Sequence, residues 1–432
     1  MIDAFRPGLS DPVVQPAPGA FARLWFGESV SLLGTATSAV LLQLLAVVQL
    51  HATPAWLGGL TAATWLPWLV IGLPAGAWVD RQPPRRVMIG ADLLAAAALI
   101  SLPISYELGT LSLWQLLIVA ALTGTSAVFF RPACVKLIPL VVADSQLMQA
   151  NARLNGSDSA SQLIGPGLAG LLARFGSTVG IGFDALSYCV SACCLWRIRV
   201  PPTSPSAAAS RPPLRSQVGI GLRFVAHDRI LRAFTVIGGL SNFGLTGFST
   251  LLVLYWTRHL HLPAQSVGLM YCLGSAGGLG GALLVGRLSA RWGSGRTSTG
   301  LLLVGGLSAL LIGLPLERSL LWLSAIGLFL MDGAIVAGNA LRGAWRQRYV
   351  PAAVMARVTT SSQVLNFGTM PVAAVVAGWL GGSLGPRSTI LVLAGVHCTA
   401  CFAVLLSPAG RVRELPATTR LTYSNACSSM GK

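Results

Sequence analysis

The stretch Gly76–Arg86 (GAWVDRQPPRR) has a weaker second copy 210 residues later, at Gly286–Arg296 (GRLSARWGSGR). Both copies place arginines five and ten residues after their glycine, whereas Asp80 of the first copy is replaced by Ala290 in the second. Further matches recur at a shift of 211, namely Arg131 with Arg342, Gly167 and Gly170 with Gly378 and Gly381, and Ser31, Thr35 and Ser38 with Asn242, Thr246 and Ser249. Any single match can arise by chance. A constant shift over separate segments indicates an internal duplication.

The composition places this duplicated chain in a membrane. Of its 432 residues 53% are hydrophobic and 10% are charged, with a mean hydropathy of +0.69. Soluble domains carry about 25% charged residues, and disordered chains have few apolar residues. The net charge of +17 does not indicate a soluble nucleic-acid-binding protein, because the basic residues stand among long apolar runs. We therefore expect an all-α, polytopic membrane protein.

Twelve apolar stretches are long enough to cross a bilayer, which takes about 20 residues as a helix. We expect spans near 24–48, 56–79, 87–105, 112–130, 156–174, 177–196, 232–256, 266–288, 298–316, 320–341, 362–384 and 388–406. If successive spans cross the membrane in opposite directions, all but four of the 30 Lys and Arg residues fall on the same side of the membrane. The exceptions are Arg174, Arg258, Arg318 and Arg387. Cytoplasmic loops carry the excess of basic residues. This pattern predicts cytoplasmic termini.

Together with the duplication, the spans predict two pseudo-symmetric six-helix bundles, at 23–196 and 231–406. A tail at 1–22, a linker at 197–230 and a flexible tail at 407–432 are all expected in the cytoplasm. The first tail lacks an apolar core with a cleavage site, so the first span is expected to direct insertion. Parallel six-helix repeats joined by a cytoplasmic linker are typical of major facilitator transporters.

The Gly76–Arg86 stretch, which lies between spans two and three, resembles the loop 2–3 signature of the major facilitator superfamily. Within that superfamily the chain resembles the bacterial macrolide-efflux and siderophore-exporter (transmembrane secretion effector) branch, through 23–34, 139–151, 165–167 and 346–358. Relatives often carry an acid where this chain has Thr35. The resemblance implies a major facilitator fold and work as a monomer in a bacterial cytoplasmic membrane.

Two sets of residues acquire roles through this resemblance. It implies a latch that holds the two halves in the outward-open state, formed by Gly76, Asp80, Arg81, Arg85, Arg86, Gly286 and Arg291; alternatively, the arginines only fix the topology. Gly165, Pro166, Gly167 and Gly170 resemble the span-five motif of drug/proton antiporters, although Ala152 and Ser161 replace two of its glycines. Ordinary packing of small residues is the alternative for this motif.

Acids inside the spans are the candidates for proton or substrate binding, because an ionisable group in hydrocarbon normally faces a cavity or a partner. Glu28, Asp92, Asp184 and Asp332 fall within spans, and Asp332 lies roughly 18 Å deep. Asp158 is expected at the start of span five, as its cap. Glu28 heads a polar stripe of Ser31, Thr35 and Ser38, which is matched in span seven by Asn242, Thr246 and Ser249. Structural acids satisfied by neighbouring hydroxyl groups are the alternative.

Other chemistries find little support. Neither of the two lysines, Lys136 and Lys432, closes a phosphate-binding loop, so no ATPase is expected. Cys398 and Cys401 have metal-site spacing without a second pair, which favours packing over a metal or a redox cofactor. No cofactor is expected, and a membrane-embedded enzyme is a remote alternative.

These observations predict a proton-coupled exporter of a small amphiphilic molecule, such as an antibiotic, a siderophore or another secondary metabolite. The alternative is an importer or facilitator of a nutrient. A polar nutrient would need several buried charged or amide groups, and the predicted spans contain no arginine away from their ends.

Overall fold

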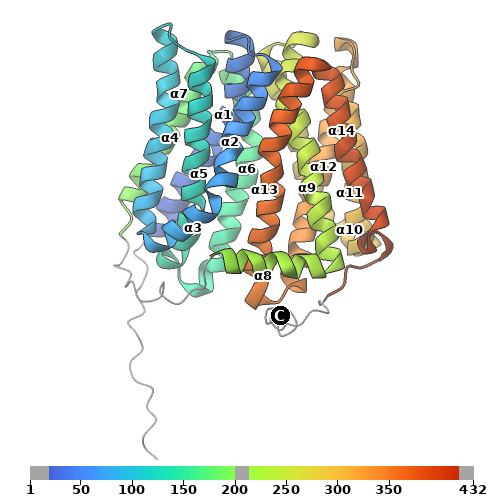
Figure 1. Cartoon of the computed structure of the whole chain (residues 1–432). Helices are drawn as coiled ribbons and strands as arrows, with labels where there is room; N and C mark the ends of the chain where they lie inside the picture. Colours follow the sequence, from blue (N-terminus) through green and yellow to red (C-terminus); the bar gives the residue numbers. More distant parts are fainter. Residues whose placement is uncertain (1–18, 200–213, 418–432) are drawn as a thin grey trace, which may run out of the picture.

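The computed structural model describes residues 19–199 and 214–417, and within these ranges the chain is helical without β-strands (Figure 1). The helices are α1 (Ala20–Leu44), α2 (Pro54–Val70), α3 (Gly72–Arg81), α4 (Pro84–Glu107), α5 (Leu113–Val141), α6 (Leu147–Leu172), α7 (Ser177–Trp196), α8 (Leu214–His227), α9 (Arg229–Leu254), α10 (Ala264–Trp292), α11 (Ser294–Ile312), α12 (Leu321–Tyr349), α13 (Ala352–Ser383) and α14 (Pro386–Phe402). Short π-helical turns extend α1 to Gln49 and α9 to His259.

Every predicted span coincides with one of these helices or, for 56–79, with the pair α2 and α3. Ten helices in the described ranges are long and apolar enough to cross a membrane, and the pair, bent by 58°, raises this number to eleven. Helix α6 is not among them, because its first half carries Asn151, Arg153, Asn155 and Asp158. The all-α membrane fold is confirmed, and the count of twelve stays a prediction.

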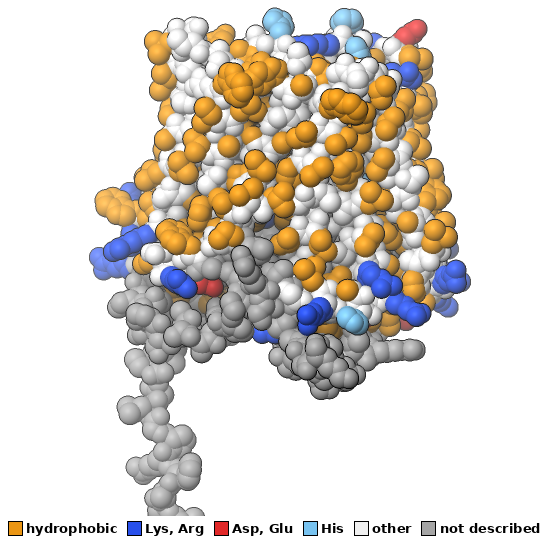
Figure 2. Space-filling model, in the orientation of Figure 1, with side chains coloured by type: hydrophobic (Ala, Val, Ile, Leu, Met, Phe, Trp, Pro, Cys, Tyr) orange, Lys and Arg blue, Asp and Glu red, His pale blue; other side chains and the backbone are white. Residues whose placement is uncertain are grey.

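The duplication is visible in the packing of two bundles, here called the N-half (α1–α7) and the C-half (α9–α14). In the N-half, α1 packs on α6 and α7; in the C-half the corresponding α9 packs on α13 and α14. The two halves meet through α2 with α13 and through α6 with α10. Figure 2 shows hydrophobic and uncharged side chains over most of the middle of one face, with the charged side chains mainly at its two ends. This is the surface expected of a protein surrounded by lipid.

The halves touch at two glycine crossings toward the end of the bundle away from α8, here called the distal end. Gly58 on α2 and Gly378 on α13 face each other. A Cβ added to Gly58 would lie 2.9 Å from the alpha carbon of Gly378. Gly170 on α6 and Gly268 on α10 make the equivalent crossing, with a corresponding distance of 2.8 Å. Side chains larger than hydrogen would push these helices apart. The small residues therefore allow the halves to close at the distal end.

Helix α8 lies crosswise under the C-half at the opposite end, which we call the α8 end (Figure 1). The sequence predicted only a linker at 197–230, so this helix was not expected. Residues 200–213 of that linker lie outside the described residues. A Cβ on Gly221 of α8 would be 2.3 Å from the carbonyl oxygen of Arg357 on α13. The helix thus rests directly on α13, and residues 214–230 of the predicted linker belong structurally to the C-half.

The prediction of a flexible tail after Ser407 is wrong for residues 408–417, while 418–432 lie outside the described residues. The carbonyl oxygen of Arg413 accepts from the backbone N–H of Gly295 at 3.0 Å, and Leu415 donates its N–H to the Ser294 hydroxyl at 2.9 Å. Trp345 donates its indole N–H to the carbonyl of Pro416 at 2.9 Å. These bonds satisfy buried polar groups and hold the tail against α11 and α12.

Candidate functional site

The structure brings three of the four candidate acids together in the N-half. Glu28 lies on α1, Asp92 on α4 and Asp184 on α7, and these helices pack on one another in the pairs α1–α7 and α4–α7. Asp92 and Asp184 are only 1% and 2% exposed, and Glu28 is half-buried. We call these three residues the N-half acid cluster.

Asp184 lies directly against the backbone of α1. A Cβ on Gly34 would be 2.3 Å from its carboxyl oxygen Oδ1 and 2.4 Å from the Ser187 hydroxyl. Ser187 donates a hydrogen bond to that carboxyl oxygen at 3.1 Å and lies within 2.8 Å of the Asp184 carbonyl oxygen. The glycine therefore leaves the space in which a buried carboxyl group and a hydroxyl group fit between two helices.

Asp92 is the least satisfied acid of the cluster. It lies against Ser191 of α7, but neither of its carboxyl oxygens makes a hydrogen bond of good geometry. Its electrostatic environment includes Glu28, which in turn interacts with Arg131 at the α8 end of α5 and with Asp158 on α6. The cluster thus leads from a buried, unpaired carboxyl group to charged residues near the α8 end.

Tyr188 connects these groups and was missed by the sequence analysis. Its hydroxyl group and that of Thr35 are hydrogen-bonded at 2.8 Å, and Thr35 also donates to the Ser31 carbonyl oxygen at 2.9 Å. Tyr188 interacts electrostatically with all three acids of the cluster. The signal in the sequence is the spacing of Asp184, Ser187, Tyr188 and Ser191, which puts all four on one helical face.

The fourth candidate acid, Asp332 on α12, lies apart from the cluster. It lines a cavity of about 700 Å³ between the two halves, together with Asp158 of α6 and Ser249 of α9. A Cβ on Gly274 of α10 would be 2.4 Å from the carboxyl oxygen Oδ2 of Asp332. Asp332 therefore has the access to a cavity that was expected of it, but no contact with the N-half acid cluster is observed among the described residues.

Two predictions about charged residues near helix ends are wrong. Asp158 does not cap span five, because α6 begins at Leu147 and Asp158 lies about three turns inside it. Arg342 and Arg346 do not belong to a loop after span ten, because α12 continues to Tyr349. In both cases the helix extends past its apolar stretch, and the three charged side chains line cavities between helices.

The matched polar stripes occupy unequal environments. Ser31 and Ser38 on α1 are buried, and Ser38 faces the Asp184 carboxyl group of the N-half acid cluster. On α9, Thr246 is buried and Asn242 lines a cavity within the C-half. The two stripes lie in different cavities or in the packed interior, so they do not form one continuous polar path.

The span-five motif joins α6 to helices on two sides. A Cβ on Gly165 would be 2.5 Å from that of Ala36 on α1, whereas one on Gly167 would be 2.3 Å from the Cys272 sulfur on α10. Gly170 makes the crossing with Gly268 described above, and a Cβ on Gly268 would also be 3.0 Å from the carbonyl oxygen of Pro166. The motif thus lies at the contact between the halves.

The latch residues are arranged around helix ends at the α8 end of the N-half. Arg85 donates from Nε to the carbonyl oxygen of Leu195 at 2.9 Å and from Nη2 to that of Trp196, at the end of α7. Lys136, not predicted to belong to the latch, donates to three carbonyl oxygens at the end of α3, those of Val79, Asp80 and Gln82, at 2.7–3.1 Å. Positive charge at helix C-termini is stabilising. Gly76, Arg81 and Arg86 lie on α3 and α4 beside these contacts, whereas Gly286 and Arg291 lie on α10.

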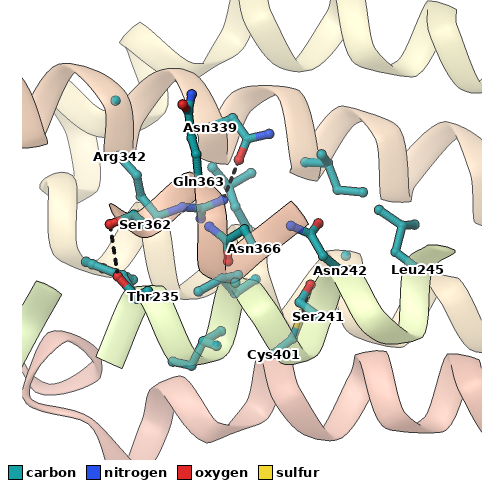
Figure 3. A pocket seen from close by; sticks show the side chains of 18 of the residues that line it. Thr235, Ser241, Asn242, Leu245, Asn339, Arg342, Ser362, Gln363, Asn366 and Cys401 are labelled. Carbon is teal, nitrogen blue, oxygen red and sulfur yellow. Dashed lines mark hydrogen bonds between the residues drawn. The ribbon is translucent and has the colours of Figure 1, made fainter. Parts of the chain in front are cut away.

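A second cavity, of about 390 Å³, lies inside the C-half between α9, α11, α12, α13 and α14 (Figure 3). Its polar lining includes Ser241, Asn242, Asn339, Arg342, Arg346, Ser362, Gln363, Asn366 and His397. Of these residues, only Asn242 was predicted from the sequence as a site residue. The expectation that the spans hold no arginine is wrong, because Arg342 and Arg346 lie on α12 and line this cavity. We call this space the C-half cavity.

Cys401 at the edge of this cavity gives no indication of a metal centre. His397 lies 3.0 Å from the Ser241 hydroxyl through Nδ1 and 3.7 Å from the Cys401 sulfur through Nε2. No group of three or more His, Cys, Asp or Glu side chains in the described ranges could hold a metal ion.

The family model of the Major Facilitator Superfamily matches residues 24–374, from the first helix to α13. The chain belongs to the major facilitator superfamily. It is therefore a small-molecule transporter of the membrane rather than an enzyme, and its two halves are the repeats of the major facilitator fold.

Curated relatives of this major facilitator protein are efflux proteins. Macrolide efflux protein A of Streptococcus pyogenes is 23% identical over 399 residues, covering 91% of this chain and 97% of the relative. The multidrug efflux pump Tap of Mycobacterium tuberculosis is 28% identical over 374 residues, covering 82% and 85%. The predicted resemblance to macrolide-efflux proteins is confirmed.

Solved structures share the fold at lower identity. A bacterial homologue of the iron transporter ferroportin, in its inward-facing state, gives a TM-score of 0.71 at 16% identity, covering 92% of this chain and all of that one. The nucleoside transporter NupG gives 0.71 at 10% identity, covering 90% and 98%. These likenesses establish the arrangement of helices and leave the substrate open.

Proposed function

We propose that this major facilitator protein is a proton-coupled exporter of a small amphiphilic molecule, such as an antibiotic, a siderophore or another secondary metabolite. It works by alternating access, as a monomer, in a bacterial cytoplasmic membrane with both termini in the cytoplasm. Export is supported by the relatives, which are macrolide and multidrug efflux proteins. The orientation is supported by the basic residues, which favour the cytoplasmic side.

The N-half acid cluster is the observation that carries proton coupling. Asp92 is buried beside Ser191 without a hydrogen bond of good geometry to either carboxyl oxygen, and an ionised carboxylate is costly in such a place. A group of this kind binds and releases a proton when its access to water changes. Glu28 and Tyr188 extend the cluster toward Arg131 and Thr35, so a proton leaving Asp92 has neighbouring groups that can accept or orient it.

Alternating access is supported by the closed distal end and by the inter-half cavity. Two glycine crossings hold the halves together there, and the cavity beside Asp332 lies between α1, α6, α10 and α12. Rocking of one half against the other about such crossings would open the distal end. We assign the loop 2–3 residues, with Asp80 and Arg81, the role of a latch for the opposite state.

The experiment compares accumulation of macrolides and fluorescent drugs in efflux-deficient bacteria that make the wild type, Asp92→Asn, Asp332→Asn or the control Glu107→Gln. Glu107 is exposed at the distal end of α4, outside both cavities. We expect lower accumulation with the wild type and with Glu107→Gln, reversed by an uncoupler, and no export by Asp92→Asn. Export by Asp92→Asn that an uncoupler still abolishes would move the proton site to Asp332 or Glu28. Export that no uncoupler affects would overturn proton coupling.

Import of a polar nutrient is the second candidate, because the C-half cavity contains the buried arginine and amide groups that such a substrate requires. The two directions are distinguished in proteoliposomes of known orientation. An importer would concentrate substrate on the side of the α8 end, whereas the exporter would remove it from that side.

A further inference from the structure

The C-half cavity combines positive charge with an absence of acids. Arg342 and Arg346 of α12 line it, and no Asp or Glu is among the residues around it in the described part of the chain. Asn339, Gln363 and Asn366 add amide groups, and Figure 3 shows Arg342 extending among them. The rest of the wall is apolar, with Leu231, Phe234, Leu245 and Ile335 among its residues.

The guanidinium group of Arg342 is only partly satisfied. Its Nη2 donates to the side-chain oxygen of Asn339 at 3.1 Å, whereas Nη1 is buried and has no partner. The Nε of Arg346 is also buried without a partner. A guanidinium group presents five N–H donors that match a carboxylate or phosphate in pairs, so the cavity contains donors without their acceptor.

The local sequence of α12 places this charge inside the bundle. Helical side chains lean toward the N-terminus of their helix, which for α12 is the distal end. Arg342 therefore reaches inward past Gly338, where a Cβ would be 2.7 Å from its Nη1. Glycine at this position leaves room for the guanidinium group, which would otherwise point toward the α8 end.

The duplication shows that the acidic partner is missing from one half only. In the N-half, Glu28 interacts with Arg131 and also with Asp158. Arg342 occupies the corresponding C-half position, but Glu28, Asp92, Asp158 and Asp184 correspond to Gly239, Leu302, Thr369 and Gly395 at the same shifts of 210 and 211. The cation has been kept and every acid has been replaced by an uncharged residue. This difference favours an acid supplied from outside the chain.

We propose that the C-half cavity binds the anionic group of the transported molecule through Arg342. The ligand class is an amphiphile with one carboxylate, phosphate or sulfonate group, held by the guanidinium group, and with an apolar body against the aliphatic wall. Binding of this class deepens the proposed export function by naming its substrate class, but it requires no proton gradient and is testable without transport.

The test uses purified full-length protein in phosphatidylcholine nanodiscs at constant ionic strength, with two matched probes. Dansylglycine carries a carboxylate, and dansylglycinamide has the same body with a neutral amide. Binding is followed by energy transfer from tryptophan to the dansyl group. We expect the wild type to bind dansylglycine about tenfold or more tightly than the amide, the difference expected of a charged hydrogen-bonded pair.

Three variants assign the preference to this site. Arg342→Gln should bind both probes equally, and Arg342→Lys should keep part of the preference because the charge stays without the planar pair of donors. Arg348→Gln is the matched control, because Arg348 is exposed on the same helix and does not line the cavity. Melting temperatures check that each variant is folded.

The proposal is overturned if the wild type does not bind dansylglycine at millimolar concentration, or if it binds both probes equally. It is also overturned if folded Arg342→Gln keeps the full preference. If the export assay shows no proton coupling but the wild type still prefers dansylglycine, the proposed coupling is wrong and the proposed anion site is retained.

Discussion

The carboxyl group of Asp184 on α7 rests on the backbone of Gly34 on α1, so close that a Cβ at residue 34 would lie 2.3 Å from Oδ1. This contact fixes the carboxyl group at the boundary between two helices that belong to the same half. It also couples the shape of α1 to the position of an acid that sequence analysis identified only as a buried candidate.

Replacing Gly34 by alanine should therefore destabilise the protein by about 1–3 kcal/mol, because the new methyl group overpacks a closed contact. Transport should fall with it, since the Asp184 carboxyl group must move. Gly90→Ala is the control, because nothing lies within 4 Å of a Cβ at that position on α4. Thermal unfolding of both variants decides the matter, and equal melting temperatures would contradict the prediction.

The hydroxyl pair of Tyr188 and Thr35 is suited to a double-mutant cycle. Tyr188→Phe and Thr35→Val each remove one partner of the 2.8 Å hydrogen bond. Each should lower the transport rate, by about tenfold if the bond orients a group in the proton path. The double variant should be no slower than the slower single variant, because the two groups act together. Independent effects that multiply would show that the bond has no role in transport.

Gly170 should be essential for closing the distal end. Gly170→Val places methyl groups where the α carbon of Gly268 lies, since even a Cβ would be 2.8 Å away. We expect a folded protein that cannot close this end and transports little. Cysteine-labelling rates of residues at the distal end should rise. Gly182→Val on α7, where a Cβ meets nothing within 4 Å, should leave both labelling and transport at the wild-type level.

Lys136 should stabilise the end of α3. Its ammonium group contacts three carbonyl oxygens there, and Lys136→Met removes these charged hydrogen bonds while keeping most of the side-chain length. A loss of about 1.5–3 kcal/mol is expected. Arg153→Met, which removes an exposed charge on α6, should cost less than about 0.5 kcal/mol. Denaturation midpoints in detergent compare the two.

The fold could be predicted because hydropathy and the repeat both act over long stretches. Residues such as Gly76 and Gly286 recur at a fixed shift, and each apolar segment marks a helix. The ends of the helices were harder to predict, since α6 begins and α12 ends in polar stretches that hydropathy assigns to loops. Hydropathy measures transfer into lipid and does not distinguish a polar loop from a polar cavity wall. Arg342 was misplaced for this reason.

The candidate site could be predicted in part. Burial of Asp92 and Asp184 followed from their position in apolar spans, and their proximity to Glu28 required knowledge of how α1, α4 and α7 pack. Tyr188 was visible only as part of a helical face shared with Asp184. Lys136 was missed because its role depends on the carbonyl groups at the end of α3, which only the packing of α3 on α5 brings to it.

The attachment of α8 to α13 determines where the polypeptide can be divided. Because α8 packs closely on α13 at Gly221, it belongs to the C-half, and the connection between the halves in the sequence is residues 200–213. A gene cut between residues 206 and 207 should yield two fragments that each keep a complete helical bundle. When they are made together in one cell, the glycine crossings at the distal end should be enough to reunite them into a working pump. A cut after His227 should fail, because it would leave α8 covalently attached to the wrong fragment.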